Sequence, residues 1–197
     1  METNNIYLRA HPIDNIHSGN DSYPEAVFGD SFSNFYSENY LKIHSGSTIK
    51  YCNVIREVPI QNLGITDMVS LATKTKVNFA DKSINEKEFE ETLRIRAFEF
   101  KISDWKKGLI QANRYKYFSH STVLVVPLNT LVNALQALDT FKRLNVGLWG
   151  YDYESNVIRK VFTPRPNKKY SEKYFNIFKQ KAFTFLTQSQ PNPETLE

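Results

Sequence analysis

The chain has 197 residues, of which 41% are hydrophobic and 14% aromatic, so it can build one core of ordinary size and we expect a single domain over residues 1–187. Its seven glycines and the lack of any long apolar run argue against fibrous, low-complexity and integral membrane proteins, and no membrane partner is expected. The N-terminus lacks the layout of a secretory signal and Cys52 is the single cysteine, which together predict a cytoplasmic protein without an internal disulfide.

The formal net charge is +4, and the charges are unevenly distributed. Acidic side chains outnumber basic ones over residues 1–40, whereas basic side chains dominate residues 93–117 and 141–197. A fold that joins the two basic segments would present a positive face to phosphate groups. The alternative is that these charges belong to ordinary solvated helix faces.

Residue patterns in the first half of the chain predict a polar start, one helix and two strands. Ser22 is a suitable helix cap, Pro24 suits a first helical turn, and Pro59 is expected to end the first strand. The expected segments are an irregular start at 1–22, a helix at 24–40, strands at 48–58 and 65–72, and a loop or hairpin excursion at 73–91.

The second half predicts strands that alternate with amphipathic helices. In the strand at 93–102 the charged positions fall out of step, which indicates a bulge or a change of exposure near Ala97 and Phe98. The other expected segments are a helix at 104–118 capped by Ser103 or Asp104, a strand at 123–126, a helix at 130–144 closed by Asn145, strands at 146–151 and 157–162, a helix at 172–186 and a disordered tail at 188–197. The order αβββαβ followed by αββα predicts an α/β fold with a mixed central sheet flanked by helices.

Acidic residues near strand ends indicate a site for a hard divalent cation. Asp67 lies near the start of one predicted strand, and Glu99 lies late in the next. Lys101 is two residues after Glu99, so both side chains project from the same face of that strand. If the two strands pair, Asp67 approaches Glu99, and the two carboxylates can hold Mg²⁺ or Mn²⁺ with Lys101 beside the ion.

The order Asp67, then Glu99-Phe100-Lys101, then Gln111-Ala-Asn-Arg-Tyr115 resembles the PD-(D/E)XK nuclease superfamily, in particular the members with a Q-x-x-x-Y motif such as RecB-type nuclease domains. The expected elements from Pro24 to Val126, about half of the chain, are similar to the restriction-endonuclease-like core of that superfamily. The resemblance implies that Asp67 and Glu99 bind the metal, that Lys101 positions the attacking water, and that Gln111 and Tyr115 line the cleft. Thr66 stands where the named motif has proline.

The superfamily often adds a further acid from its first helix, and Glu25 is the position that matches, although Glu57 competes with it. Each motif also has a structural alternative. Glu99 and Lys101 could form a plain salt bridge, and the stripe of Lys107, Gln111 and Tyr115 could be a solvated helix face. A second acid-x-lysine sequence, Asp104-Trp105-Lys106, is interpreted as a helix cap.

These observations predict a Mg²⁺-dependent nuclease that hydrolyses phosphodiester bonds in DNA. Lys106, Lys107, Arg114 and Lys116 surround the predicted motif helix and are expected to contact phosphates. Expected partners are DNA and either a second copy of the chain or a larger nuclease complex. The alternative is a catalytically inactive nuclease-fold module that binds nucleic acid or a protein partner.

Overall fold

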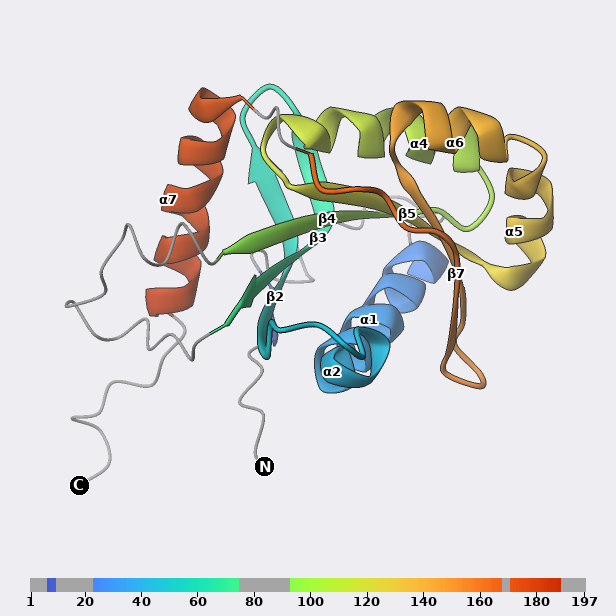
Figure 1. The fold of residues 1–197 in the computed structure, drawn as a ribbon, viewed down its shortest axis with the longest axis horizontal. Coiled ribbons are helices and arrows are strands. Elements are labelled where there is room, and N and C mark those ends of the chain that lie inside the picture. The colour runs from blue at the N-terminus through green and yellow to red at the C-terminus, as the bar shows by residue number, and fades with distance from the viewer. Residues whose placement is uncertain (1–6, 10–22, 75–92, 168–170, 189–197) are drawn as a thin grey trace.

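The computed structural model describes residues 7–9, 23–74, 93–167 and 171–188. Seven strands of these residues form one sheet whose spatial order equals their order in the chain (Figure 1). They are β1 (Tyr7–Arg9), β2 (Tyr51–Ile60), β3 (Gly64–Thr73), β4 (Arg94–Phe100), β5 (Ser121–Pro127), β6 (Gly147–Asp152) and β7 (Val157–Phe162). No helix of the described segments is long and apolar enough to cross a bilayer.

The predicted mixed sheet is confirmed. Strands β2, β3 and β4 pair antiparallel, β4, β5 and β6 pair parallel, and β7 pairs antiparallel with β6. Strand β1 pairs parallel with β2. Parallel neighbours need a crossover connection, and helical segments make these connections between β4 and β5 and between β5 and β6.

Helices cover both faces of the sheet. One face carries α1 (Tyr23–Glu38) and α2 (Tyr40–Ile43), and the other carries the remaining helices of the described residues (Figure 1). Those remaining helices are α4 (Trp105–Arg114), the 3₁₀ turn η2 (Tyr115–Tyr117), α5 (Leu128–Leu135), α6 (Leu138–Leu144) and α7 (Glu172–Gln188).

The central strand β5 shows why the sheet needs both layers. Val123 and Val125 pack in the cluster with α1, whereas Leu124 and Val126 pack in the cluster with α4, α5 and α6. Successive side chains of a strand point to opposite faces, so a strand that is covered on both sides is apolar at every position. Burial on both faces therefore accounts for the apolar run that predicted this strand.

Several predicted bounds are corrected by the structure. Strand β1 falls in the start that was predicted to be irregular, and at three residues it is too short for an alternation signal. Strand β2 starts at Tyr51 and continues through Pro59, which lies beyond the residues that pair with β1. The predicted helix at 104–118 ends at Arg114 and continues as η2, and the predicted helix at 130–144 is interrupted at 136–137 between α5 and α6.

Other sequence signals behave as predicted. The Asp104 side chain accepts a hydrogen bond from the Lys107 N–H and so caps α4, and Asn145 closes α6 in the left-handed conformation with φ 51°. Ser22 and most of the predicted loop at 73–91 lie outside the described residues. The predicted tail also lies outside them, except that Gln188 is the last residue of α7.

The predicted irregularity near Ala97 and Phe98 is a change of exposure and not a bulge. Pairing of β4 with β3 and β5 runs through these residues without a shift, whereas exposure falls from Arg94 at the start of the strand to the fully buried Glu99. The distortion lies in β2 instead, where Glu57 adopts a φ of 56°. A positive φ is costly for a residue with a Cβ, so the surrounding sheet must hold Glu57 in place.

Candidate active site

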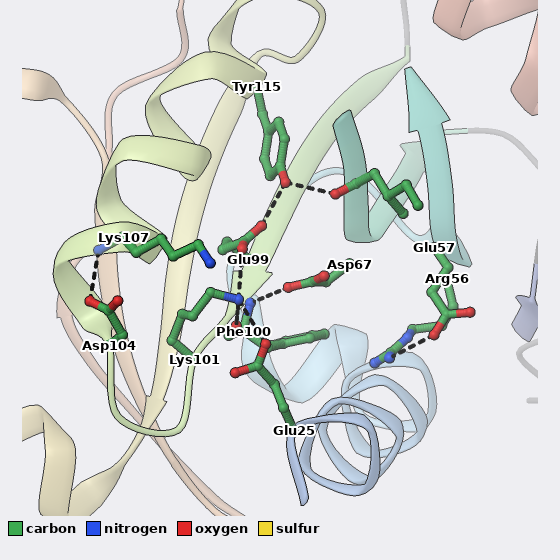
Figure 2. Close-up of polar contacts among 11 residues, drawn as sticks. Glu25, Arg56, Glu57, Asp67, Glu99, Phe100, Lys101, Asp104, Lys107 and Tyr115 are labelled. Atoms are coloured by element: carbon green, nitrogen blue, oxygen red, sulfur yellow. Dashed lines mark hydrogen bonds and ion pairs between the residues drawn. The ribbon is translucent and has the colours of Figure 1, made fainter. Parts of the chain in front are cut away.

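The candidate site lies where β3 and β4 separate. Met68 and Phe98 form the last paired positions, and beyond them the Asp67 side chain fills the gap between the strands (Figure 2). The Phe100 N–H donates to Asp67 Oδ2 at 2.7 Å, so a side chain replaces the backbone partner that the separation removes. The half-buried Asp67 is thereby held beside the end of β4.

Glu99 is a buried carboxylate, with an exposed fraction of 0%. The Tyr115 hydroxyl donates to Glu99 Oε2 at 2.6 Å and also lies 2.9 Å from the Ile65 carbonyl oxygen (Figure 2). Because Tyr115 begins η2 directly after α4, the helix that follows β4 returns a hydroxyl group to the end of β4. Tyr115 therefore fixes one oxygen of Glu99 and leaves Oε1 facing the rest of the site.

The Lys101 ammonium lies among the acids. Its Nζ is 3.0 Å from Glu99 Oε1 and 2.7 Å from Oε1 of Glu25, which is in the first turn of α1 (Figure 2). The same atom donates to the carbonyl oxygen of Phe100. Of the two competing acids, Glu25 is therefore the one that contacts Lys101.

Glu57 lies on the far side of Asp67. The pairs Arg56–Met68 and Val58–Thr66 flank an interrupted position at which Glu57 and Asp67 are opposite one another. The Glu57 carboxylate is turned towards Arg56, with Oε1 3.7 Å from Arg56 Nη2. The left-handed backbone at Glu57 thus accompanies the break in the ladder that frees Asp67 to reach Phe100.

The electrostatics of the two central acids are unusual. Burial raises the pKa of Glu99 to about 8, and the neighbouring Asp67 carboxylate adds to this rise. Burial likewise raises the pKa of Asp67 to about 6, against the opposing effect of Lys101. For Lys101 itself burial acts to lower the pKa, but the attraction of Glu99 and Asp67 outweighs it and the pKa is raised. Paired acids with raised pKa values are typical of sites that bind cations or transfer protons.

Helix α4 approaches the site closely because it carries Gly108. A Cβ placed on this glycine would lie 2.6 Å from Lys101 Cγ and 2.6 Å from Leu124 Cδ1. Ala112, one turn further along the same side of α4, is also fully buried, so two small residues let this helix lie against the sheet. The glycine thus sets the space in which the Lys101 side chain runs.

The predicted polar stripe on α4 is only partly turned towards the acids. Tyr115 reaches Glu99, and the exposed Lys107 side chain points towards Glu99 and Lys101 (Figure 2). Gln111 is half-buried, and among the described residues its Oε1 has no hydrogen-bond partner. A buried acceptor without a donor is costly, so Gln111 has an unused capacity for a ligand or water.

The other predicted phosphate-binding residues are spread along α4 and the η2 turn that follows it. Lys106 is exposed at its start, with Nζ 5.7 Å from the Trp105 ring, and Arg114 is exposed at its end. Lys116 donates from Nζ to the Leu144 carbonyl oxygen at 2.8 Å. The Lys116 ammonium therefore caps the end of α6, a structural function that sequence reasoning did not foresee.

Arg56 is a part of the site that sequence reasoning missed. Its side chain is 3% exposed, and its guanidinium lies over the Phe100 ring, donates to Ser33 Oγ at 3.2 Å and helps to lower the pKa of Asp67. Gly29 of α1 makes room for it, because a Cβ there would lie 2.3 Å from Arg56 Nη1. The signal in the sequence was a charged pair, Arg56-Glu57, inside an apolar strand.

The side chains of the candidate site can be compared with what the implied Mg²⁺ ion requires. Among the described residues no three His, Cys, Asp or Glu side chains are grouped as metal ligands. Asp67 and Glu99 are nevertheless a suitable pair, because Mg²⁺ commonly uses one or two carboxylates and keeps several waters. Glu99 Oε1 is buried with the Lys101 ammonium 3.0 Å away, and the Asp67 carboxylate raises the pKa of Glu99, an effect that a bound cation relieves. The residues therefore fit the ion.

Comparisons with known proteins give little information on this site. No protein-family model matches the chain, and no curated protein matches it. Among solved structures, the chain is similar to a protein of unknown function from Silicibacter pomeroyi, with 17% sequence identity over 76% of this chain and 77% of that chain and a TM-score of 0.43.

Proposed function

We propose that this protein is a Mg²⁺-dependent nuclease of the PD-(D/E)XK type that hydrolyses phosphodiester bonds in DNA. The observation that carries the proposal is the convergence of Asp67, Glu99 and Lys101 at the point where β3 and β4 separate. Burying the charged side chains of Asp67, Glu99 and Lys101 costs folding free energy, and functional sites commonly retain such buried charges.

The order of elements supports a restriction-endonuclease-like core. Helix α1 is followed by the antiparallel strands β2, β3 and β4, then by α4, and then by β5 parallel to β4. This is the αβββαβ order that the resemblance implies for the superfamily. The motif positions also fall on the corresponding elements, with Asp67 on β3, Glu99 on β4 and Gln111 on α4.

In the proposed reaction each side chain has a separate task. Asp67 and Glu99 would hold the Mg²⁺ ion, which when bound supplies Lewis-acid polarisation of the scissile phosphate. The Lys101 ammonium orients the attacking water and offsets negative charge on the phosphate. Tyr115 is a positioning residue, because its hydroxyl holds Glu99 Oε2 and so directs Oε1 towards the cluster.

The substrate backbone is expected to approach along the start of α4. Lys107 is exposed and its side chain points towards the acids, and Lys106 is exposed beside it. Exposed lysines give phosphate contacts that are independent of sequence and sensitive to salt. Glu25 keeps Lys101 in place from the other side of the cluster, at 2.7 Å from its Nζ.

A cleavage assay with matched variants tests the proposal. Plasmid and single-stranded DNA are incubated with the wild type, with Glu99→Gln and with Lys101→Met, in Mg²⁺ and in EDTA. We expect cleavage by the wild type in Mg²⁺ only, and a loss of about a thousandfold or more in each variant. Cleavage that persists in EDTA, or that is unchanged in Glu99→Gln, would overturn the proposal.

Matched controls come from the start of α7, where Glu172 and Lys173 are exposed. Glu172→Gln and Lys173→Met make the same changes in chemistry away from the candidate site, and both should cleave like the wild type. Mn²⁺ binding followed by electron paramagnetic resonance gives a second measurement that does not depend on turnover. The wild type should bind Mn²⁺, and Asp67→Asn and Glu99→Gln should weaken that binding at least tenfold, on the order of 1.4 kcal/mol.

A second candidate, the inactive nuclease-fold module, is favoured by one observation. Lys101 already contacts both Glu25 and Glu99, so the cluster is partly neutralised without a cation. This candidate predicts a DNA complex with a steep salt dependence, no cleavage product and no Mn²⁺ binding. The two measurements above therefore distinguish the two functions.

A further inference from the structure

A polar cavity lies on the α1 face of the sheet. It has a volume of about 220 Å³ and lies between α1, α2 and the beginning of β4 and β5. Its lining includes Arg94, Arg96, His44, Tyr36 and Ser121. No aspartate or glutamate is found among the described residues that line it. The charged side chains among its described lining residues are Arg94 and Arg96, both on β4.

Arg96 is the central charged group of this cavity. Its Nε donates to Ser121 Oγ at 3.0 Å, its Nη1 lies 3.0 Å from His44 Nε2, and its guanidinium lies 5.4 Å from the centre of the Trp149 ring. Among the described residues no carboxylate pairs with Arg96, and Nη2 has no hydrogen bond. A half-buried guanidinium normally has an anionic partner, because removing it from water is costly.

The two histidines near Arg96, His44 and His120, are neutral, so they neither balance its charge nor add to it. Arginine can only donate, so His44 Nε2 accepts and the ring proton lies on Nδ1. Burial, with Arg96 and Lys160, lowers the pKa of His44 to about 3. His120 accepts the Ile95 N–H at Nδ1, and burial lowers its pKa to about 4. Both rings are thus hydrogen-bonding groups at neutral pH.

This cavity is separate from the candidate active site. Arg96 belongs to the face of β4 that carries Phe98 and Phe100 and packs against α1, whereas Glu99 belongs to the opposite face, three residues further along the strand. The two sites also differ in charge, since acids surround Lys101 and no acid among the described residues lines the Arg96 cavity. A ligand bound here would not touch the candidate metal ligands.

We propose that this cavity binds the phosphate group of a small phosphate monoester through Arg96 and Arg94. Guanidinium groups match the geometry of phosphate oxygens, and the Nη2 edge of Arg96 lies at the same opening as the exposed Arg94, whose Nη1 donates to the Leu93 carbonyl oxygen. The Ser121 hydroxyl accepts from Arg96 and keeps its own proton to donate. At about 220 Å³ the cavity is smaller than a typical drug-sized site, so it accepts a phosphate with a compact body such as a single sugar.

Calorimetric titration of the full chain in EDTA at low ionic strength tests this proposal. The probes are inorganic phosphate, ribose 5-phosphate and unphosphorylated ribose, with an oligonucleotide carrying either a 5′-phosphate or a 5′-hydroxyl as a further pair. We expect one ribose 5-phosphate per chain and no binding of ribose. If the 5′-phosphate oligonucleotide binds and the 5′-hydroxyl oligonucleotide does not, the phosphate at a strand end is a source of the ligand. If neither oligonucleotide binds, the ligand is a free small molecule. Both results support the monoester site.

Variants locate the binding. Arg96→Gln and Arg94→Gln should each weaken ribose 5-phosphate binding about tenfold or more, whereas Arg143→Gln, on the exposed surface of α6, makes the same charge change and should have no effect. Arg94 is exposed, so its variant remains informative if Arg96→Gln does not fold. The proposal is overturned if no phosphate probe binds, if ribose binds equally well, or if Arg143→Gln weakens binding as much as Arg94→Gln. Cleavage by the Asp67–Glu99 site is measured separately and does not depend on this result.

Discussion

Replacement of Glu99 by glutamine tests the electrostatic description of the candidate site. Glutamine has nearly the same shape, so it can still accept the hydrogen bond from the Tyr115 hydroxyl. It removes the negative charge that lies near Asp67 and 3.0 Å from Lys101 Nζ. The variant therefore separates the cost of a buried carboxylate from the benefit of its ion pair with Lys101.

The magnitude follows from the pKa of Glu99, which burial and then Asp67 raise from 4.5 to about 8. Between these two values the folded chain binds a proton that the unfolded chain has released, so the stability falls as the pH rises. From pH 5 to pH 8 this linkage removes at most about 3.5 kcal/mol from the free energy of unfolding. Glutamine does not bind or release a proton in this range, so the free energy of unfolding of Glu99→Gln should fall less between pH 5 and pH 8.

Urea unfolding in EDTA, followed by the fluorescence of the buried Trp149, measures the effect at pH 5 and pH 8. Relative to the wild type, the variant should gain about 1–3 kcal/mol of stability on going from pH 5 to pH 8. The exposed substitution Glu172→Gln should give no such gain. A variant that instead becomes less stable relative to the wild type at pH 8 would refute this reasoning, because the Glu99–Lys101 contact would then be a stabilising salt bridge.

Three further predictions concern single side chains. Tyr115→Phe removes the donor to Glu99 Oε2 and should cost about 1–3 kcal/mol in urea unfolding, with reduced cleavage; an unchanged midpoint would show that the hydroxyl bond contributes nothing. Gly108→Ala should destabilise by about 1–3 kcal/mol, because its Cβ would collide with Lys101, and a gain in stability, as alanine normally gives in a helix, would contradict the close approach. His44 is kept neutral, so it contributes stability above its ordinary pKa of 6.5 that is lost as the pH falls towards 3. His44→Gln should therefore flatten the stability profile below pH 6.5 by up to about 1.4 kcal/mol per pH unit, and parallel profiles for the two proteins would exclude this role.

The sequence by itself was sufficient to predict most of the helices and strands and their order along the chain. Strand β5 is apolar at successive positions because both of its faces are buried, and Asp104 caps α4 through a bond to a residue three positions away. Both features depend only on residues that are close in the chain, so the sequence pattern is enough to predict them. Alternation along the predicted strand placed Glu99 and Lys101 on one side, and the 3.0 Å contact between their side chains agrees with that prediction although β4 ends at Phe100.

Contacts between distant segments were decided only by tertiary structure. The contact of Glu25 with Lys101 joins α1 to the end of β4, and the sequence favoured Glu25 over Glu57 only through the resemblance, not through a local signal. The buried Arg56, the space left by Gly29 and the use of Lys116 as a cap for α6 depend on segments that meet only after folding.

The break between β3 and β4 depends on folding in the same way, and it decides the geometry of the candidate site. Hydrophobic periodicity shows which face of an element is buried, but it does not show where two paired strands separate or which side chain then replaces the lost backbone partner. In this protein Asp67 takes that place beside Phe100, opposite the left-handed Glu57. Residue type and spacing thus determined which groups could meet, and the packing of α1 and α4 on the sheet determined which of them do.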